Sequence, residues 1–315
     1  MKRFVAGQWF LIALAAVLAV GFAMPDRLQG LADAKQLRMG LVATVLFLMA
    51  LPLETRIVWR VFRRPWAAFL AVGVNMGLLP VIAWLVSLGL SREMAIGLLV
   101  TAATPCTLAS ASVWTRRAGG NDAVAMFVTI LTNVSCFVVT PMWLLATTGK
   151  SVDIPMGPMI ARLGLLVVLP IVLAQLLRQI APLGRWATDR KRTLSTLAQC
   201  GILTMVLIGA VRSANVLRTA GEASLGLADL ALMLVAVLAV HLAALWLGCR
   251  LARLLRMAND DVPAVAFAGS QKTLMVGLDV AITYYGGLAI LPMVAYHVGQ
   301  LLVDTLIADR WRSAK

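Results

Sequence analysis

The amino-acid sequence predicts an all-α membrane protein with ten transmembrane helices, organised as two inverted repeats of five helices. Three observations lead to this prediction. The chain of 315 residues is 61% hydrophobic and only 13% charged, about half the charged share of a typical globular domain. Its apolar residues form runs of about 20, the length that crosses a bilayer as a helix, without the period-2 alternation of a membrane β-barrel. Two of these runs, at equivalent places in the two halves, are interrupted by polar residues.

Windows of about 20 residues divide the chain into ten spans with short connections. The spans run over residues 5–24, 38–54, 65–88, 93–115, 121–147, 158–180, 193–214, 226–249, 262–284 and 287–308. We expect them to form one transporter domain over residues 1–315, with repeats of about 1–150 and 155–315. Because five is an odd number, the repeats are expected to have opposite orientations in the membrane. The first span is longer than the apolar region of a signal peptide, so we expect it to be retained.

The chain carries a formal net charge of +14 and has a pI of about 10.8, but the placement of its charges argues against a nucleic-acid partner. The basic residues cluster at the ends of the apolar spans, where Lys and Arg set the orientation of a multi-span protein. They are more than twice as frequent on the side that holds the two termini. This predicts a multi-pass protein in the lipid bilayer of a bacterial-type inner (plasma) membrane, with both termini in the cytoplasm.

Oxygen-bearing side chains lie on the third and fifth spans. Asn75 lies among apolar residues of the third, and Thr129, Thr132 and Asn133 share one face of the fifth because they are spaced i, i+3, i+4. Hydroxyl and amide oxygens are hard ligands of the kind that a dehydrated Na⁺ binds. The alternative is interhelical hydrogen bonding, worth about 0.6 kcal/mol per bond. The spacing alone fits both interpretations.

The fourth span is interrupted near its middle at Pro105, which removes one backbone donor and clashes with the preceding turn. Hydroxyl side chains surround the proline, namely Thr104, Thr107, Ser110 and Ser112. If a helix restarts after Pro105, its free N–H groups and partial positive charge suit a carboxylate or another anion. The alternative is a proline kink whose hydroxyls bond back to helical carbonyls. Both interpretations stay open from the residues alone.

The ninth span is interrupted by Ser270, Gln271, Lys272 and Thr273. A lysine near the bilayer midplane costs about 2.5–3.5 kcal/mol on insertion scales, so chains keep one only where it faces protein or water. The polar run predicts that the helix unwinds there and lines a cavity. Because the fourth and ninth spans hold equivalent places in the two halves, their paired interruptions predict the binding site of a transporter.

Polar residues also mark the eighth and tenth spans. His297, Gln300 and Asp304 are spaced i, i+3, i+7 and therefore share a face of the tenth span. This face can pack against the ninth span, and a Lys272–Asp279 contact there stays open. Asp304 is expected to lie near the cytoplasmic end, within reach of water. His241 in the eighth span is more typical of an interhelical hydrogen bond than of a ligand.

Several of these segments together resemble a known family. The segment Thr104–Ser112, followed by Gly120–Ala123 and Thr140-Pro141, is similar to the fourth and fifth helices of the bile acid:sodium symporter superfamily. The segments Ser270–Gly277 and Tyr296–Gln300 resemble its symporter-like (SBF-like) branch. The resemblance covers nearly the whole chain. It implies a panel of helices one, two, six and seven, and a core of helices three to five and eight to ten, in which the broken helices 4 and 9 cross.

The resemblance also implies positions for coupling ions. In sodium-coupled relatives two Na⁺ ions lie behind the crossing. Asn75 takes the position of a sodium-binding glutamine, Ser112 lies near a ligating asparagine, and Thr129 and Thr132 lie near hydroxyl ligands of the fifth helix. These four residues are therefore the candidate Na⁺ ligands.

The sequence departs from the family pattern at the ninth span. Ser270 takes the place of the glutamate that both sodium sites share, and Lys272 enters the unwound loop. Like charges at such range repel by several kcal/mol at an effective dielectric of about 20, so we expect two-sodium coupling to be lost. Three roles for Lys272 stay open: it stands in for a sodium ion, binds an anionic substrate directly, or carries protons.

These observations predict a secondary active transporter that moves a small organic anion by alternating access. The candidate coupling ions are Na⁺ and H⁺, and no other cofactor is expected. Walker A, HExxH and GxSxG motifs are absent from the sequence, so the chain is not expected to be an enzyme. The alternative from another class is a non-transporting membrane regulator or assembly factor that retains the fold. The oligomeric state is not predicted.

Overall fold

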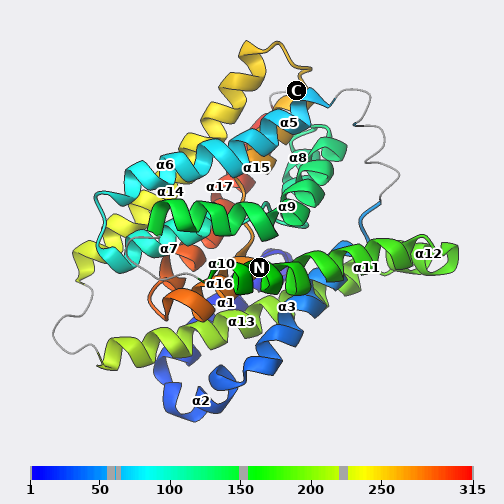
Figure 1. The fold of residues 1–315 in the computed structure, drawn as a ribbon. Helices are drawn as coiled ribbons and strands as arrows, with labels where there is room; N and C mark the ends of the chain where they lie inside the picture. The colour runs from blue at the N-terminus through cyan, green and yellow to red at the C-terminus, as the bar shows by residue number, and fades with distance from the viewer. Residues whose placement is uncertain (1, 55–60, 62–64, 149–154, 220–225, 314–315) are drawn as a thin grey trace.

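The structure is a computed structural model that describes residues 2–54, 61, 65–148, 155–219 and 226–313 (Figure 1). The described residues form helices and no strand. The helices of the first half are α1 (Lys2–Ala23), α2 (Pro25–Asp33), α3 (Lys35–Ala50), α5 (Trp66–Gly73), η1 (Val74–Leu78), α6 (Leu79–Ser87), α7 (Arg92–Ala103), α8 (Ser110–Arg117) and α9 (Asp122–Thr148). Those of the second half are α10 (Met156–Leu163), η2 (Gly164–Val168), α11 (Leu169–Arg178), α12 (Ala181–Asp189), α13 (Lys191–Thr219), α14 (Leu227–Leu254), α15 (Asp261–Ser270), α16 (Leu274–Val280), η4 (Ala281–Tyr285) and α17 (Ile290–Ser313).

Seven stretches of the described chain are long and apolar enough to cross a membrane. They are Trp66–Ser87, Asp122–Thr148, Met156–Arg178, Lys191–Arg218, Leu227–Leu254, Asp261–Tyr285 and Ile290–Ser313, which match the third, the fifth and the sixth to tenth predicted spans. The other three predicted spans are also helical but are not among these seven stretches. Of these, α1 turns by 105° into α2, whereas α3 is short and the fourth span divides into α7 and α8.

Two short helices were not predicted. The nine-residue helices α2 and α12 each have a proline at the start, where its missing N–H costs nothing. Both are too short and too polar for a hydropathy window of about 20 residues to detect. The second span is also displaced, because α3 begins three residues before the predicted start and buries Arg38.

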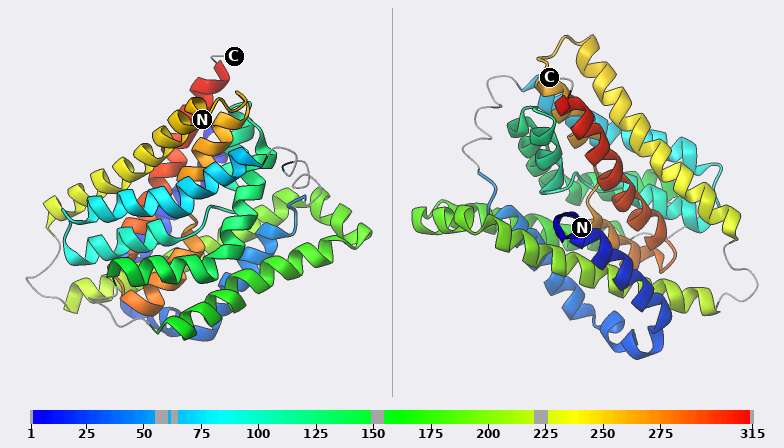
Figure 2. Two further views of the ribbon diagram at one scale, coloured as in Figure 1. Left: turned by 45° about the horizontal axis from the view of Figure 1, so that its top comes forward. Right: turned by 180° about the vertical axis from the view of Figure 1, so that it is seen from behind.

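The described helices pack as two layers that lie against each other (Figures 1 and 2). The small layer contains α1–α3 and α10–α13, and the large layer contains α5–α9 and α14–α17. Close contacts within the small layer depend on glycine. A Cβ on Gly21 would lie 2.5 Å from the Cβ of Ala210, and a Cβ on Gly201 would lie 2.3 Å from a Val45 methyl group. Such small residues let membrane helices approach closely.

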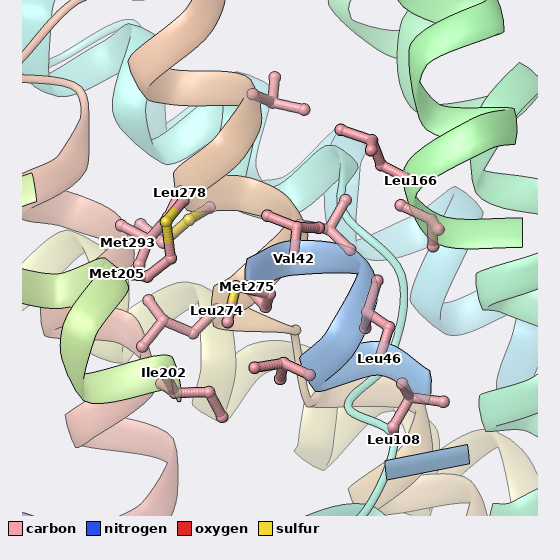
Figure 3. Close-up of a cluster of buried hydrophobic side chains, with 14 of the residues drawn as sticks. Val42, Leu46, Leu108, Leu166, Ile202, Met205, Leu274, Met275, Leu278 and Met293 are labelled. Carbon is pink, nitrogen blue, oxygen red and sulfur yellow. The ribbon is translucent and has the colours of Figure 1, made fainter. Parts of the chain in front are cut away.

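An apolar cluster joins the two layers around α16 (Figure 3). Leu274, Met275 and Leu278 of α16 are buried among side chains from the small layer, including Val42 of α3 and Met205 of α13. The apolar cluster therefore fixes α16, and with it the interruption of the ninth span, against both layers.

Candidate functional site

The candidate site is built around Lys272, which lies in the unwound segment between α15 and α16. Its side chain is only 2% exposed. The Nζ atom donates to three oxygens, which are the backbone oxygen of Asn75 at 2.7 Å, Oδ1 of Asn75 at 3.1 Å and the backbone oxygen of Thr104 at 2.7 Å. All three oxygens are neutral. We call these three atoms the oxygen cage.

Pro80 explains why a helix can offer carbonyls to this cage. The proline has no N–H, so it cannot donate to the carbonyl of Met76 four residues before it or of Asn75 five residues before it. The helix widens by one residue at this point, and the N–H of Leu79 donates to the carbonyl of Val74 instead. The Asn75 carbonyl is then available to Lys272. The Met76 carbonyl accepts from the indole N–H of Trp143 at 2.6 Å.

Asn75 also holds the interruption of the ninth span in place. Its Nδ2 donates to the carbonyls of Ala268 and Gln271, both at 2.9 Å. A Cβ on Gly269 would lie 2.9 Å from a methyl group of Val74, so only glycine lets α15 come this close to η1. One amide side chain thus satisfies backbone groups of the unwound segment and supplies an oxygen to its lysine.

The fourth span is interrupted over residues 104–109, and this segment contacts the interruption of the ninth span directly. The N–H of Thr273 donates to the carbonyl of Pro105 at 2.9 Å, and Lys272 reaches the Thr104 carbonyl where α7 ends. The two predicted interruptions are therefore observed, and they touch each other through backbone and side chain. Unwound carbonyls and helix C-termini coordinate cations in transporters, and Nζ of Lys272 contacts two carbonyls of this kind.

Helix α9 satisfies the backbone of the fourth-span interruption. Thr129 donates to the Thr107 carbonyl at 3.0 Å, Thr132 accepts from the Cys106 N–H at 3.2 Å, and Asn133 donates to the Cys106 carbonyl at 2.8 Å. These are the interhelical bonds that the sequence left as an alternative to Na⁺ binding. Among the atoms that the structure describes, Oδ1 of Asn133 is buried and accepts no hydrogen bond.

The four candidate Na⁺ ligands do not share one oxygen shell in this arrangement. Both oxygens of Asn75 face Lys272, Thr129 and Thr132 bond to separate backbone groups, and Ser112 donates to the carbonyl of Ala109 within its own turn at 3.1 Å. No group of three or more acidic, histidine or cysteine side chains able to hold a metal occurs in the described part of the chain. The Na⁺ site at these residues stays a prediction.

Gln271 connects the two interruptions to the eighth and tenth spans. Its Oε1 accepts from the hydroxyls of Thr107 at 2.9 Å and Ser110 at 2.8 Å, and its Nε2 donates to Oδ2 of Asp304 at 2.5 Å. The Ala111 N–H donates to Thr107 at 3.2 Å, so this threonine caps the start of α8. The residues predicted around Pro105 are thus bonded to those predicted around Lys272.

The tenth span supplies the remaining contacts. Gln300 bonds both backbone groups of Lys272, accepting from its N–H at 2.9 Å and donating to its carbonyl at 3.0 Å, and it also contacts Nδ1 of His297 at 2.9 Å. The hydroxyl of Tyr296 donates to the Ser270 carbonyl at 2.7 Å. Tyr296 was not among the predicted site residues, although it belongs to the segment Tyr296–Gln300 that carries the family resemblance.

The structure corrects one expectation about an acidic residue and answers one question that the sequence left open. Asp304 does not reach water: it is fully buried and pairs through Oδ1 with Nε2 of His241 at 2.9 Å. Its distance from the helix end was misleading because α14 covers it. Asp279 does not contact Lys272; it forms a two-point ion pair with Arg162 of α10, at 2.9 and 2.6 Å. This ion pair links the two layers.

Comparison with known proteins adds a family. The model of the SBF-like CPA transporter family matches residues 8–313. The uncharacterized sodium-dependent transporter YocS of Bacillus subtilis (strain 168) is 23% identical over 309 residues, which cover 97% of this chain and 91% of that protein.

Two further relatives are eukaryotic. The probable chloroplastic sodium/metabolite cotransporter BASS4 of Oryza sativa subsp. indica is 27% identical over 234 residues, 70% of this chain, and the match spans only 55% of the plant protein. The sodium/bile acid cotransporter 7 of Xenopus tropicalis is 22% identical over 247 residues, covering 76% of this chain and 67% of that protein.

Proposed function

Since this chain belongs to the SBF-like CPA transporter family, we propose that it is a secondary active transporter of a small organic anion. The names of its relatives refer to metabolites and bile acids as solutes, and bile acids are organic anions. The matched family is one of transporters rather than enzymes. An anionic solute also suits a site that carries a buried ammonium and no unpaired carboxylate next to it.

The observation that carries the proposal is the direct contact between the two interrupted helices. Thr273 bonds to Pro105 and Lys272 bonds to Thr104, so the interruptions cross at one buried point. Paired interrupted helices at equivalent places in two repeats are typical of the substrate and ion sites of secondary transporters. Two helices with only a packing role would be expected to keep their backbone hydrogen bonds, and not to unwind where they meet.

We infer that the full arrangement has ten transmembrane helices in two inverted five-helix repeats, about 1–150 and 155–315. In this proposal the small layer is the panel, the large layer is the core, and alternating access moves one against the other. The excess of Lys and Arg supports a plasma-membrane orientation with both termini in the cytoplasm. The Arg162–Asp279 ion pair is a contact that such a movement would stretch or break.

Lys272 acts in this proposal as a tethered cation that takes the place of one coupling ion. Its ammonium takes the oxygens that a dehydrated cation would take from the protein. All three of its donor hydrogens have an acceptor, so a direct bond to the substrate would require the loss of one. The lysine is therefore proposed to have two roles. Its positive charge attracts the anionic solute, and its ammonium occupies the place of a Na⁺ ion where the two interrupted helices meet.

The test is uptake of a library of labelled organic acids into proteoliposomes, in Na⁺ and in Na⁺-free buffer. We expect uptake by the parent protein in both buffers, loss of uptake in Lys272→Met, and parental uptake in Lys35→Gln, an exposed lysine used as the matched control. Parental uptake by Lys272→Met would contradict the role of the lysine. A parent that stops when Na⁺ is removed would contradict the tethered-cation proposal.

A further inference from the structure

A second ionisable site, separate from the oxygen cage, lies between α14 and α17. His241 is near the middle of α14 and is 1% exposed, and Asp304 of α17 is 0% exposed. Nε2 of the histidine lies 2.9 Å from Oδ1 of the aspartate. Within the described residues, His241 is the one basic side chain within ion-pair distance of Asp304. Asp279, by contrast, is bonded by a permanently charged arginine.

Both ring nitrogens of His241 face acceptors. Nε2 faces the carboxylate, and Nδ1 lies 3.4 Å from the carbonyl of Ser270. With one added proton the pair is neutral overall: Nδ1–H points to the carbonyl, and the other proton lies between Nε2 and Asp304. Without that proton, a ring lone pair must face either the Ser270 carbonyl or the carboxylate. The proton-loaded pair therefore makes one more hydrogen bond than the pair without that proton.

Loss of the proton also leaves a net negative charge in a buried place. The other carboxylate oxygen, Oδ2, accepts from the neutral amide of Gln271 at 2.5 Å. A hydrogen-bonded carboxylate in a buried site remains costly unless a cation compensates it. In the chain segments that the structure describes, no arginine fixes the charge of this pair, in contrast to Asp279, so the net charge of the site depends on whether the proton is present.

The other titratable groups around the pair are few. Tyr296 of α17 packs its ring edge-on against His241, with ring centroids 5.5 Å apart, and its hydroxyl donates to the same Ser270 carbonyl that lies near Nδ1 of His241. The sulfur of Cys106 lies 3.7 Å from the Thr129 hydroxyl, and His297 is bonded to Gln300.

The remaining ionisable residues of α14, of α17 and of the helices packed against them lie toward the helix ends, are engaged elsewhere or are cysteines. They are Arg92 and Glu93 of α7, Arg116 and Arg117 of α8, Lys191, Arg192, Cys200, Arg212 and Arg218 of α13, Asp229, Cys249, Arg250 and Arg253 of α14, Asp261 of α15, Asp279 of α16, and Asp309, Arg310 and Arg312 of α17. α5, η1 and α6 carry no charged residue.

We propose that His241 and Asp304 bind and release one proton during the transport cycle, so that H⁺ is a coupling ion of this transporter. The proposal rests on the proposed function and adds a site to it. Gln271 supplies the link: the same amide that donates to Asp304 accepts from Thr107 and Ser110 at the crossing. A change in the charge of Asp304 therefore acts on the crossing through one side chain.

The test uses the proton itself as the probe and needs no organic solute. Proteoliposomes on a solid-supported membrane are stepped from pH 8 to pH 5 in Na⁺-free buffer, and the transient current is recorded. A proton that enters a buried site moves through part of the membrane field, whereas a proton that binds at the surface does not. We expect a transient in the parent, its loss in Asp304→Asn, and its loss in His241→Gln. Asp309→Asn, an exposed aspartate five residues along the same helix, should keep the parental current.

The outcomes separate this proposal from its neighbours. A folded parent without a transient overturns it, even if neither variant can be purified. A transient that survives in Asp304→Asn but disappears in Lys272→Met also overturns it, because the proton then binds at the lysine. If an organic acid is taken up at the same rate with and without an inward proton gradient, proton coupling at His241 and Asp304 is contradicted, whereas the proposed transport function is supported. A normal transient in a protein that takes up no solute supports the pair and counts against the proposed function.

Discussion

Lys272→Met should leave the protein about as stable as the parent while abolishing its function. The substitution keeps the volume of the side chain but removes the ammonium, so three hydrogen bonds are lost. At about 0.6 kcal/mol for each interhelical bond in a membrane, the loss is about 2 kcal/mol. The same change removes the cost of a lysine near the membrane centre, about 2.5–3.5 kcal/mol on insertion scales. The two terms oppose each other, so the free energy of unfolding should stay within about 1–2 kcal/mol of the parent.

The measurement is reversible unfolding in mixed detergent micelles, followed by the fluorescence of the nine tryptophans. Asn75→Ala is the comparison variant. It removes the amide that bonds the carbonyls of Ala268 and Gln271, and it removes one of the three oxygens that accept from the Lys272 ammonium. The three bonds are worth about 2 kcal/mol on the same scale, and nothing offsets their loss because the ammonium stays, so this variant should lose at least about 2 kcal/mol. If Lys272→Met lost as much as Asn75→Ala, the lysine would be a structural element and the reasoning about a tethered cation would fail.

Three further predictions follow from the same contacts. Lys272→Ala leaves the oxygen cage in place without its ammonium, so uptake lost in this variant should return when ethylammonium or Na⁺ is added at millimolar concentration. Gly269→Ala would place a methyl group 2.9 Å from a valine side chain of η1 and should cost about 1–3 kcal/mol of stability, whereas Gly73→Ala, with no atom within 4 Å of its new Cβ, should cost little. Arg162→Ala leaves the buried carboxylate of Asp279 unpaired and should cost about 3–5 kcal/mol, and adding Asp279→Asn should recover part of that loss.

Each of these predictions has a contrary result. Equal rescue of Lys272→Met, whose side chain fills the cage, would show that the added cation acts elsewhere. Equal stability of the two glycine variants would mean that α15 and η1 are less closely packed than described. An Arg162→Ala variant as stable as the parent would mean that water already solvates Asp279.

The positions of the helices were largely readable from the sequence, but their partners were not. The interruption at Lys272 was predictable because a polar run inside an apolar segment can only be kept where the helix unwinds. The oxygens that surround the ammonium were not predictable, because they come from helices about 170 and 200 residues away in the chain. Asn75 was a candidate because of its side-chain amide. Its backbone carbonyl also accepts from Lys272, and this carbonyl is available only because Pro80 has no N–H to donate to it.

The burial of Asp304 was also not predictable from the sequence. Its place near a helix end suggested exposure, but burial is decided by which neighbour lies alongside, and a single sequence does not contain that information. The helices α2 and α12 were missed because a window long enough to detect a membrane span averages over nine-residue helices.

A cation that is covalently attached has consequences for bioenergetics. A bound Na⁺ enters from one side and leaves on the other, and each crossing adds the free energy of one charge moving through the membrane potential, about 2.3 kcal/mol per 100 mV. An ammonium fixed in the chain returns with every cycle and adds nothing. A carrier that uses Lys272 in place of one ion therefore gives up about a 50-fold accumulation of its solute per 100 mV, since 1.4 kcal/mol is a factor of ten. In exchange, its crossing is occupied by a cation at any sodium concentration.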